Sequence, residues 1–253
     1  MRIAFTISSY RLTSFVRLGI LQIKSLFPDS PILVSDDPSP ESPEIQKTCD
    51  ELGCAYRGAN KRRGHFAGDF QSLVNSLIFA EAIECDVAVK VSQRFIFRKP
   101  EAMQVIVDTF DNNNIMAATP GQPKITGQTR TASGFGAFTT LSDVVFLRVG
   151  AMSAEQLLHL YRGRLIRETV PWASFIECVV DEIHTIMFPG RTKKIEEFTN
   201  PNPIHDPIYL RRYQASEKMY HELAAKHNMG GIFPLNEWGQ IENREYFCRP
   251  AVI

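Results

Sequence analysis

Short apolar runs alternate with amphipathic stretches through the first half of the chain. Apolar runs predict buried strands, and apolar residues recurring every three or four positions predict helices. The predicted strands cover residues 3–7, 31–34, about 54–56 and 86–91. The predicted helices cover residues 13–26, 43–52 and 69–84, and Gly53 ends the second of them. This order predicts an α/β fold, in which a mostly parallel, twisted sheet carries helices on both faces.

The second half of the chain has a less regular pattern. It predicts helices over residues 100–112, 153–161, 172–187 and 207–228, with Ser153 as an N-cap, and strands over residues 115–118 and 144–149. A proline-rich stretch at residues 200–206 precedes the last helix. We therefore expect one domain over residues 1–194 and a helical extension over residues 195–253, packed on that domain.

Three of the predicted strands lead directly into polar residues. The first is followed by Ser8-Ser9-Tyr10, the second by Ser35-Asp36-Asp37, and the strand over residues 86–91 by Ser92-Gln93-Arg94. Ligands of open α/β sheets bind beyond the carboxyl ends of the strands, so these residues predict a binding site. The first segment also fits a helix cap with a surface tyrosine, and the second fits an Asx turn before Pro38.

The composition argues against several classes of function. The chain has 28 basic and 28 acidic residues, so it lacks the basic excess typical of nucleic-acid binding. Its five cysteines are scattered and fit reduced thiols better than a zinc site. The sequence shows no pattern of a signal peptide and no apolar stretch of membrane-spanning length, and we expect a cytoplasmic protein.

The order of these segments resembles glycosyltransferases of the GT-A fold, of the family-2 kind. The resemblance covers roughly residues 1–185 and rests on order and context, chiefly on Ala4-Phe5-Thr6-Ile7-Ser8-Ser9-Tyr10 and on Ile32-Leu33-Val34-Ser35-Asp36-Asp37-Pro38-Ser39. It implies a GT-A-like fold and transfer of a sugar from a nucleotide-sugar donor, expected to be UDP-linked, to a hydroxyl acceptor. A role in polysaccharide biosynthesis would follow, with a glycan or another hydroxyl compound as the acceptor.

The chain departs from the family at one decisive place. Metal-dependent members carry Asp-x-Asp where this chain has Ser92-Gln93-Arg94. Divalent cations prefer carboxylate oxygens, whereas a guanidinium repels them and pairs with phosphate through forked hydrogen bonds. The resemblance therefore implies a site without metal or other cofactor, in which Arg94 takes the metal's place. The alternative is a structural Arg94 in a fold that has lost the activity.

The resemblance also supplies candidate residues elsewhere in the chain. The Gly-containing segment over residues 61–69 and the small-residue loop over residues 131–138 match regions that contact the donor, and a histidine late in the chain matches one that reaches the diphosphate. The donor-binding candidates are Ser8, Tyr10, Asp36, Asp37, Arg63, His65, Asp69, Ser92, Gln93, Arg94, Gly134 and His205. Asp69 also fits a residue that stabilises a helix N-terminus.

Two carboxylates are candidates for catalysis. Glu177 and Asp181 stand four residues apart on one predicted helix and so share a face. A carboxylate in a cleft can take the proton from an acceptor hydroxyl, so either is a candidate general base. A solvated acidic helix face is the alternative.

Two other functions stay open. One is a non-catalytic binding or assembly module of the same fold, and the other is a nucleotidyltransferase. A nucleotidyltransferase is expected to have a Gly-rich basic loop after the first strand, and residues 8–13 contain no glycine. The missing glycines also exclude a dinucleotide-binding GxGxxG motif at this place.

Overall fold

The computed structural model describes residues 1–93, 95, 97, 100–120, 144–167, 179, 183–195 and 222–229. The chain divides into two compact units, residues 1–199 and 200–253. In the second unit, residues 222–226 are helical and Asn228 has a φ of 57°. The small-residue loop predicted over residues 131–138 and most of the helices predicted over 172–187 and 207–228 lie outside the described residues.

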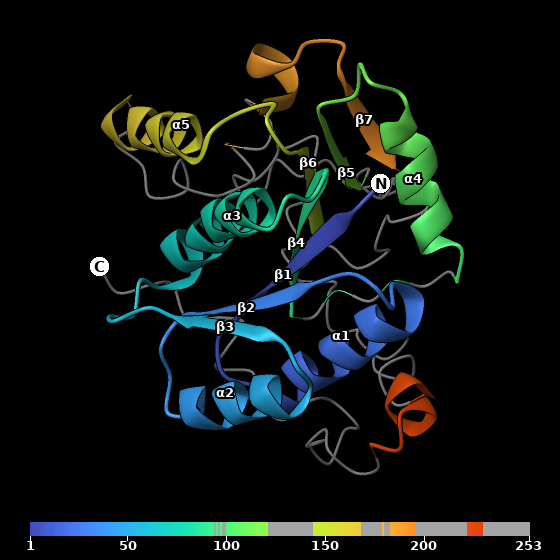
Figure 1. Cartoon of the computed structure of the whole chain (residues 1–253). Helices are drawn as coiled ribbons and strands as arrows, with labels where there is room; N and C mark the ends of the chain where they lie inside the picture. Colours follow the sequence, from blue (N-terminus) through green and yellow to red (C-terminus); the bar gives the residue numbers. More distant parts are fainter. Residues whose placement is uncertain are drawn as a thin grey trace, which may run out of the picture. The chain divides into compact units, whose positions relative to one another are not determined.

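The first unit is built on one mixed sheet. Its strands are Ile3–Ser9 (β1), Ile32–Asp36 (β2), Ala55–Gly58 (β3), Val87–Ser92 (β4), Ala117–Pro120 (β5), Val144–Arg148 (β6) and Thr192–Ile195 (β7). Their spatial order is β3-β2-β1-β4-β6-β5-β7 (Figure 1). Strand β6 runs antiparallel to β4 and β5, whereas the other neighbouring pairs are parallel. The prediction of a mostly parallel α/β sheet is confirmed.

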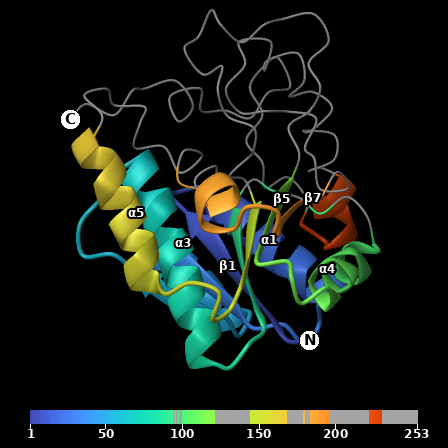
Figure 2. The ribbon, with the colours of Figure 1, turned by 90° about the horizontal axis from the view of Figure 1, so that it is seen from above.

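Helices cover both faces of this sheet. They are Thr13–Leu26 (α1), Ser42–Glu51 (α2), His65–Ala82 (α3), Ala102–Asp111 (α4) and Ala154–Arg167 (α5), with a π-helical turn at Ile183–Met187. Helices α3 and α5 lie side by side on one face, and α1 and α4 cover the opposite face (Figure 2). Helix α2 packs beside α1 on that second face.

Side chains alternate between the two faces of the sheet along each strand, which explains why the sheet lies between two layers of helices. In β1, Phe5 and Ile7 belong to the apolar core shared with α1, α2 and α4, whereas Ala4 belongs to the core under α3 and α5. Successive strand residues point to opposite faces, so both faces are apolar where helices cover them. In the core shared with α1, α2 and α4, the ring centroids of Phe5 and Phe27 lie 4.6 Å apart.

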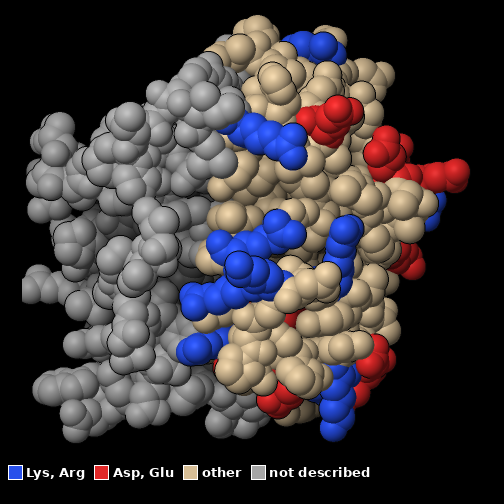
Figure 3. All heavy atoms as spheres, turned by 90° about the vertical axis from the view of Figure 1, so that its left-hand side faces the viewer, with Lys and Arg blue, Asp and Glu red and all other residues tan. Residues whose placement is uncertain are grey.

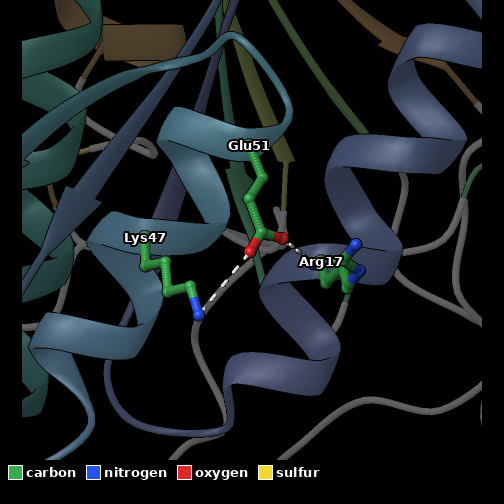
Figure 4. A network of polar contacts seen from close by, with 3 residues as sticks. All are labelled: Arg17, Lys47 and Glu51. Carbon is green, nitrogen blue, oxygen red and sulfur yellow. Dashed lines mark hydrogen bonds and ion pairs between the residues drawn. The ribbon is translucent and has the colours of Figure 1, made fainter.

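An ion pair joins α1 to α2 at the surface. Arg17 Nη1 lies 2.8 Å from Glu51 Oε2, and Lys47 Nζ lies 4.0 Å from the other oxygen of the same carboxylate (Figure 4). The hydrogen bond from Arg17 lowers the pKa of Glu51. Both side chains of the shorter pair are exposed to solvent, so the contact orients the two helices more than it stabilises them.

Several predicted boundaries are confirmed and others change. Helix α1 spans the predicted residues, and Gly53, with a φ of 62°, follows the end of α2 as predicted. Ser153 does cap α5: its Oγ accepts the Gln156 N–H at 3.1 Å, and the Gln156 side chain accepts the Ser153 N–H at 2.8 Å. That helix continues to Arg167, beyond its predicted end.

Two elements were predicted wrongly. Helix α3 begins at His65, four residues before the predicted start at Asp69, because Gly64, with a φ of 81°, is its N-cap and Gly68 is tolerated inside it. The sequence pattern also missed β7, a Thr-Lys-Lys-Ile strand at an edge of the sheet in which both lysines are exposed. No described helix is both long enough and apolar enough to cross a membrane.

Candidate functional site

The carboxyl ends of β1, β2 and β4 lie side by side. Ser8 stands opposite Ser35 on β2 and opposite Ser92 on β4. The chain runs from β1 to β2 and β3 on one side and then returns to β4 on the other side. Such a reversal of strand order opens a crevice at the carboxyl edge, where ligands of open α/β sheets bind. The three polar segments that follow these strands therefore share one edge of the sheet.

Gln93 joins the two sides of this reversal. Its side-chain Oε1 accepts the Tyr10 N–H at 3.0 Å, and its Nε2 donates to the Tyr10 carbonyl at 3.1 Å. The Gln93 backbone N–H also donates to the Ser8 carbonyl at 3.1 Å. The residue at the centre of the tripeptide after β4 thus fixes the loop after β1.

Asp36 is buried and serves as a junction between elements. Its carboxylate accepts hydrogen bonds from the hydroxyls of Ser9 (3.0 Å), Ser42 (2.6 Å) and Tyr56 (3.0 Å). Burial, together with the Asp36 charge, raises the pKa of Tyr56 to about 12. The carboxylate ties β1, α2 and β3 to the end of β2, which is a structural use of the residue.

Asp37 holds the segment before α3. Its carboxylate accepts the backbone N–H groups of Arg63 at 2.7 Å and Gly64 at 3.1 Å. Burial raises the pKa of Asp37, although these two N–H groups and Arg62 act in the opposite direction. A β-carbon added at Gly68 would lie 3.2 Å from the Asp37 carboxylate, so a glycine at this position lets α3 approach it.

Asp69 points onto the sheet. Its Oδ1 lies 2.6 Å from Nζ of Lys90, a β4 residue with no exposed surface. Asp69 therefore neutralises a buried cation under α3. It lies inside α3 rather than at its first residue, and the helix-terminal position expected from the sequence was wrong.

A polar pocket of about 290 Å³ lies beside these anchors. Its lining includes no large apolar side chain and comes from the end of β2, from β3 and its following loop, and from α3. The lining residues are Ser35, Asp36, Asp37, Arg57, Gly58, Ala59, Asn60, Arg63, Gly68, Gln71 and Asn75. Asp36, Asp37 and Arg63 were predicted from the sequence as donor-binding residues.

The α3 side of this pocket was not predicted from the sequence. Asn75 is buried and donates to Ser35 Oγ at 2.8 Å, and Gln71 donates to Asn75 Oδ1 at 3.0 Å. Two amides four residues apart, and so on one face of the helix, were the available indication of a polar cavity. Arg57 was missed because its strand is too short to show a pattern.

Two arginine side chains lie close to the Tyr10 ring. The guanidinium carbon of Arg62 lies 4.6 Å from the centre of the Tyr10 ring, and that of Arg11 lies 5.3 Å from it. Arg11 and Leu12 adopt left-handed backbone conformations, with φ of 56° and 55°. Two consecutive non-glycine residues in this region store strain that the surrounding contacts must support.

Basic side chains gather on this side of the molecule. Figure 3 shows the face on the left of Figure 1, where β3 ends and α3 begins. Several Lys and Arg side chains lie close together on the described surface, and most visible Asp and Glu side chains lie toward its right-hand edge. Such a cluster of cations attracts anions even though the whole chain has no net charge.

The described carboxylates near this edge are already engaged by other groups. Ser92 and Gln93 offer no carboxylate, and the carboxylates of Asp36 and Asp37 already accept three and two hydrogen bonds. Within the described part of the chain, no three His, Cys, Asp or Glu residues are grouped to hold a metal.

The remaining predicted residues cannot be placed in this site. Arg94, Gly134, Glu177, Asp181 and His205 lie outside the described residues. His65 is the first residue of α3, and only its backbone is described. The structure thus brings together Ser8, Tyr10, Asp36, Asp37, Arg63, Ser92 and Gln93 at one edge.

No protein-family model matches the chain, and no curated protein matches it. Solved structures do match. One is glucosyl-3-phosphoglycerate synthase from Mycobacterium tuberculosis with Mn²⁺, UDP-glucose and phosphoglyceric acid: TM-score 0.51, 14% identity, covering 94% of this chain and 84% of that one. Another is a mannosyltransferase from Pyrobaculum calidifontis with GDP-mannose and Mn²⁺: TM-score 0.50, 10% identity, covering 91% of this chain and 65% of that one.

A cytidylyltransferase from Leptospira borgpetersenii is also similar, with a TM-score of 0.50 and 11% identity over 90% of this chain and 94% of that one. At such identities the similarity shows the fold alone. The fold is GT-A-like, as the sequence resemblance implied.

Proposed function

We propose that this protein is a glycosyltransferase that moves a sugar from a nucleotide-sugar donor, expected to be UDP-linked, to a hydroxyl acceptor. One observation carries the proposal: the polar ends of β1, β2 and β4 stand in register beside a polar pocket lined by Arg57 and Arg63. The pocket lies at the edge where ligands of such sheets bind. Similar structures that were solved with UDP-glucose and GDP-mannose add support.

In this proposal the pocket holds the nucleoside. Side-chain donors from Arg57, Arg63 and Asn75 face the hydroxyl and carbonyl oxygens of ribose and base. The internal hydrogen bonds of Asp36 and Asp37 make these carboxylates supports of the pocket, with ligand contact as a secondary role. Arg94 stays the predicted replacement for a metal ion, and Glu177 or Asp181 stays the predicted general base.

The first test is calorimetric titration with UDP, GDP, CDP and ADP in the presence of EDTA. We expect at least one nucleoside diphosphate to bind, and Arg57→Ala and Arg63→Ala each to weaken it about tenfold, the usual effect of losing a charge-assisted hydrogen bond. Arg191→Ala is the matched control, because Arg191 is exposed and precedes β7 at the opposite edge of the sheet. If all four nucleotides fail to bind with and without Mn²⁺, the proposal is wrong.

A nucleotidyltransferase is the second candidate, favoured by the similarity to the cytidylyltransferase. Such an enzyme would consume a nucleoside triphosphate and a phosphorylated substrate and release pyrophosphate. Pyrophosphate release from CTP with a sugar phosphate would support it, whereas release of free nucleoside diphosphate from a nucleotide sugar would support the glycosyltransferase. Binding without either turnover would point to a non-catalytic module.

A further inference from the structure

Polar side chains form a hydrogen-bonded chain along the α3 wall of the polar pocket. Gln71 Nε2 lies 3.0 Å from Asn75 Oδ1, and Asn75 Nδ2 lies 2.8 Å from Ser35 Oγ. Ser72 Oγ lies 3.1 Å from Ser35 Oγ and also 3.1 Å from the Gly68 carbonyl oxygen. Ser35, Ser72 and Asn75 are buried, whereas Gln71 is partly exposed and lines the pocket. Gln71 is therefore the end of the chain that a ligand can reach.

The two serine hydroxyls set the direction of this chain. A hydroxyl has one proton to donate, and a carbonyl oxygen can only accept. Ser72 therefore donates to the Gly68 carbonyl, and Ser35 donates to Ser72. The Ser35 oxygen is left as an acceptor, so the Asn75 amide turns its nitrogen to Ser35 and its oxygen to Gln71. All four contacts are then hydrogen bonds.

The reversed orientation of the two amides makes one hydrogen bond fewer. With both amides turned round, Ser35 would donate to the Asn75 oxygen, and Asn75 would donate to the Gln71 oxygen. Ser72 would then have a single proton for two acceptors, Gly68 and Ser35, so one of the four contacts would have no proton. A buried polar contact without its proton is costly. The chain thus turns the Gln71 nitrogen toward Asn75 and leaves the Gln71 oxygen for a ligand.

The other groups of the pocket make this oxygen distinctive. The carboxylates of Asp36 and Asp37 accept three and two hydrogen bonds from the protein. No described residue donates to Gln71 Oε1. The guanidiniums of Arg57 and Arg63, which line the same pocket, can only donate. The pocket therefore presents a fixed acceptor together with cationic donors.

A ring N–H beside a carbonyl oxygen, as in uracil and guanine, satisfies both kinds of group. At the same place on the ring, cytosine and adenine have a nitrogen lone pair, which would leave Gln71 Oε1 facing another acceptor. We infer that Gln71 is a specificity residue that accepts this ring N–H and so selects uracil or guanine nucleotides over those of cytosine and adenine. That the ligand is a nucleotide rests on the proposed function.

The test is calorimetric titration of the full chain with the diphosphates and triphosphates of uridine, guanosine, cytidine and adenosine. The diphosphates are titrated with EDTA and the triphosphates with Mg²⁺. We expect a uracil or guanine nucleotide to bind at least about tenfold more tightly than its cytosine and adenine counterparts. Gln71→Ala should abolish this preference by weakening the preferred nucleotide.

Ser72→Ala tests the direction of the chain from outside the pocket lining. Without this hydroxyl, each amide orientation makes two hydrogen bonds, so both should be populated. The preferred nucleotide should bind about twofold more weakly, because about half of the protein has the competent orientation, and the cytosine and adenine counterparts should bind more tightly. Ser76→Ala is the matched control, since Ser76 is equally buried one turn further along α3 and its Oγ makes no hydrogen bond with a described residue. We expect it to leave the preference unchanged.

The outcomes separate the two proposals. If diphosphates bind without the expected base preference, or if Ser72→Ala and Ser76→Ala change that preference equally, the specificity role is wrong and the proposed function stands. If only triphosphates bind, and with the expected preference, the specificity role stands and the glycosyltransferase proposal falls. If no nucleotide binds, both fall. Thermal unfolding verifies that each variant keeps the fold, and Gln71→Ala, at a partly exposed position, carries the test if Ser72→Ala does not fold.

Discussion

Gln93 binds Tyr10 as a neighbouring strand would, with its side-chain amide in place of a peptide group. One hydrogen bond of 3.0 Å runs from the Tyr10 N–H to the amide oxygen, and one of 3.1 Å runs from the amide nitrogen to the Tyr10 carbonyl. The contact extends the pairing of β1 and β4 beyond Ser8 and Ser92, where the regular ladder ends. It fixes the loop that carries the left-handed Arg11 and Leu12.

Replacing Gln93 by Glu exchanges the side-chain NH₂ group for an oxygen, and this change should destabilise the protein. The carboxylate oxygen would face the Tyr10 carbonyl where an N–H donor stood, and we expect a loss of about 1–3 kcal/mol at neutral pH. Because a protonated carboxyl can donate again and the facing carbonyl raises the pKa of the introduced carboxyl in the folded variant, the loss should shrink as the pH falls toward about 4 and be smallest below that. Urea denaturation at several pH values measures both effects.

Gln156→Glu is the matched control for this substitution. Gln156 accepts the Ser153 N–H in a capping arrangement in which Glu serves as well as Gln. We expect its stability to be unchanged or slightly higher at neutral pH. An equal loss in both variants would mean that added negative charge, rather than the lost donor, is responsible.

Gly68 and Gly19 give a second matched pair, since both lie inside helices. A β-carbon at Gly68 would lie 3.2 Å from the Asp37 carboxylate, whereas one at Gly19 would meet only Ile7 Cδ1, at an ordinary 3.5 Å. Alanine favours a helix interior over glycine by about 1 kcal/mol. Gly19→Ala should therefore raise stability, and Gly68→Ala should lose that gain by displacing Asp37 from Arg63 and Gly64.

Thermal unfolding of the two glycine variants, together with nucleotide titration, tests this expectation. Gly68→Ala should weaken nucleotide binding because Asp37 and Arg63 line the pocket, and Gly19→Ala should leave it unchanged. A stabilised Gly68→Ala protein with wild-type binding would show that the carboxylate moves aside without consequence.

The sequence predicted the layers of the fold well because burial sets the pattern. Strands such as β4 are covered on both faces and are nearly continuous apolar runs, and α1 shows a clear apolar face. The pattern failed at β7, because in this short edge strand only Ile195 is buried and both lysines are exposed. It also failed at the start of α3, because glycine weakens the helical pattern before the helix is established.

The candidate site was predictable only in part, for a different reason. The polar residues after the strands were visible, because the carboxyl edge of a parallel sheet is where polar groups interrupt apolar runs. What each carboxylate does was not visible, because its hydrogen-bond partners are distant in the sequence. Asp36 binds Tyr56 and Asp37 binds Arg63, and neither spacing follows a helical or strand period.

The buried pair of Lys90 and Asp69 should respond asymmetrically to substitution. Asp69→Asn leaves a fully buried ammonium without its carboxylate, and such a change costs about 3–5 kcal/mol. Lys90→Met should cost less, since the Asp69 side chain retains some exposure to water. The double variant should be more stable than Asp69→Asn alone. Strictly additive losses in a double-mutant cycle from urea denaturation would contradict this coupling.

Asp37 gives a prediction about pH. Burial raises its pKa above the ordinary value of 3.8, against the hydrogen bonds from Arg63 and Gly64 and the charge of Arg62. A carboxyl with a raised pKa binds its proton more tightly in the folded than in the unfolded protein. Its contribution to stability is therefore most favourable below the unfolded pKa, and it falls as the pH rises through the folded pKa.

Asp37→Asn isolates this contribution, because the amide does not titrate. The variant loses one hydrogen-bond acceptor at every pH. Only in the wild-type protein does residue 37 contribute a free energy of unfolding that changes with pH. The free energy of unfolding of wild type minus variant should therefore fall as the pH rises from about 3 to about 7. Urea denaturation over that range measures the difference. If the difference instead rises with pH, the two backbone N–H groups outweigh burial, and the pKa of Asp37 is lowered in the folded protein.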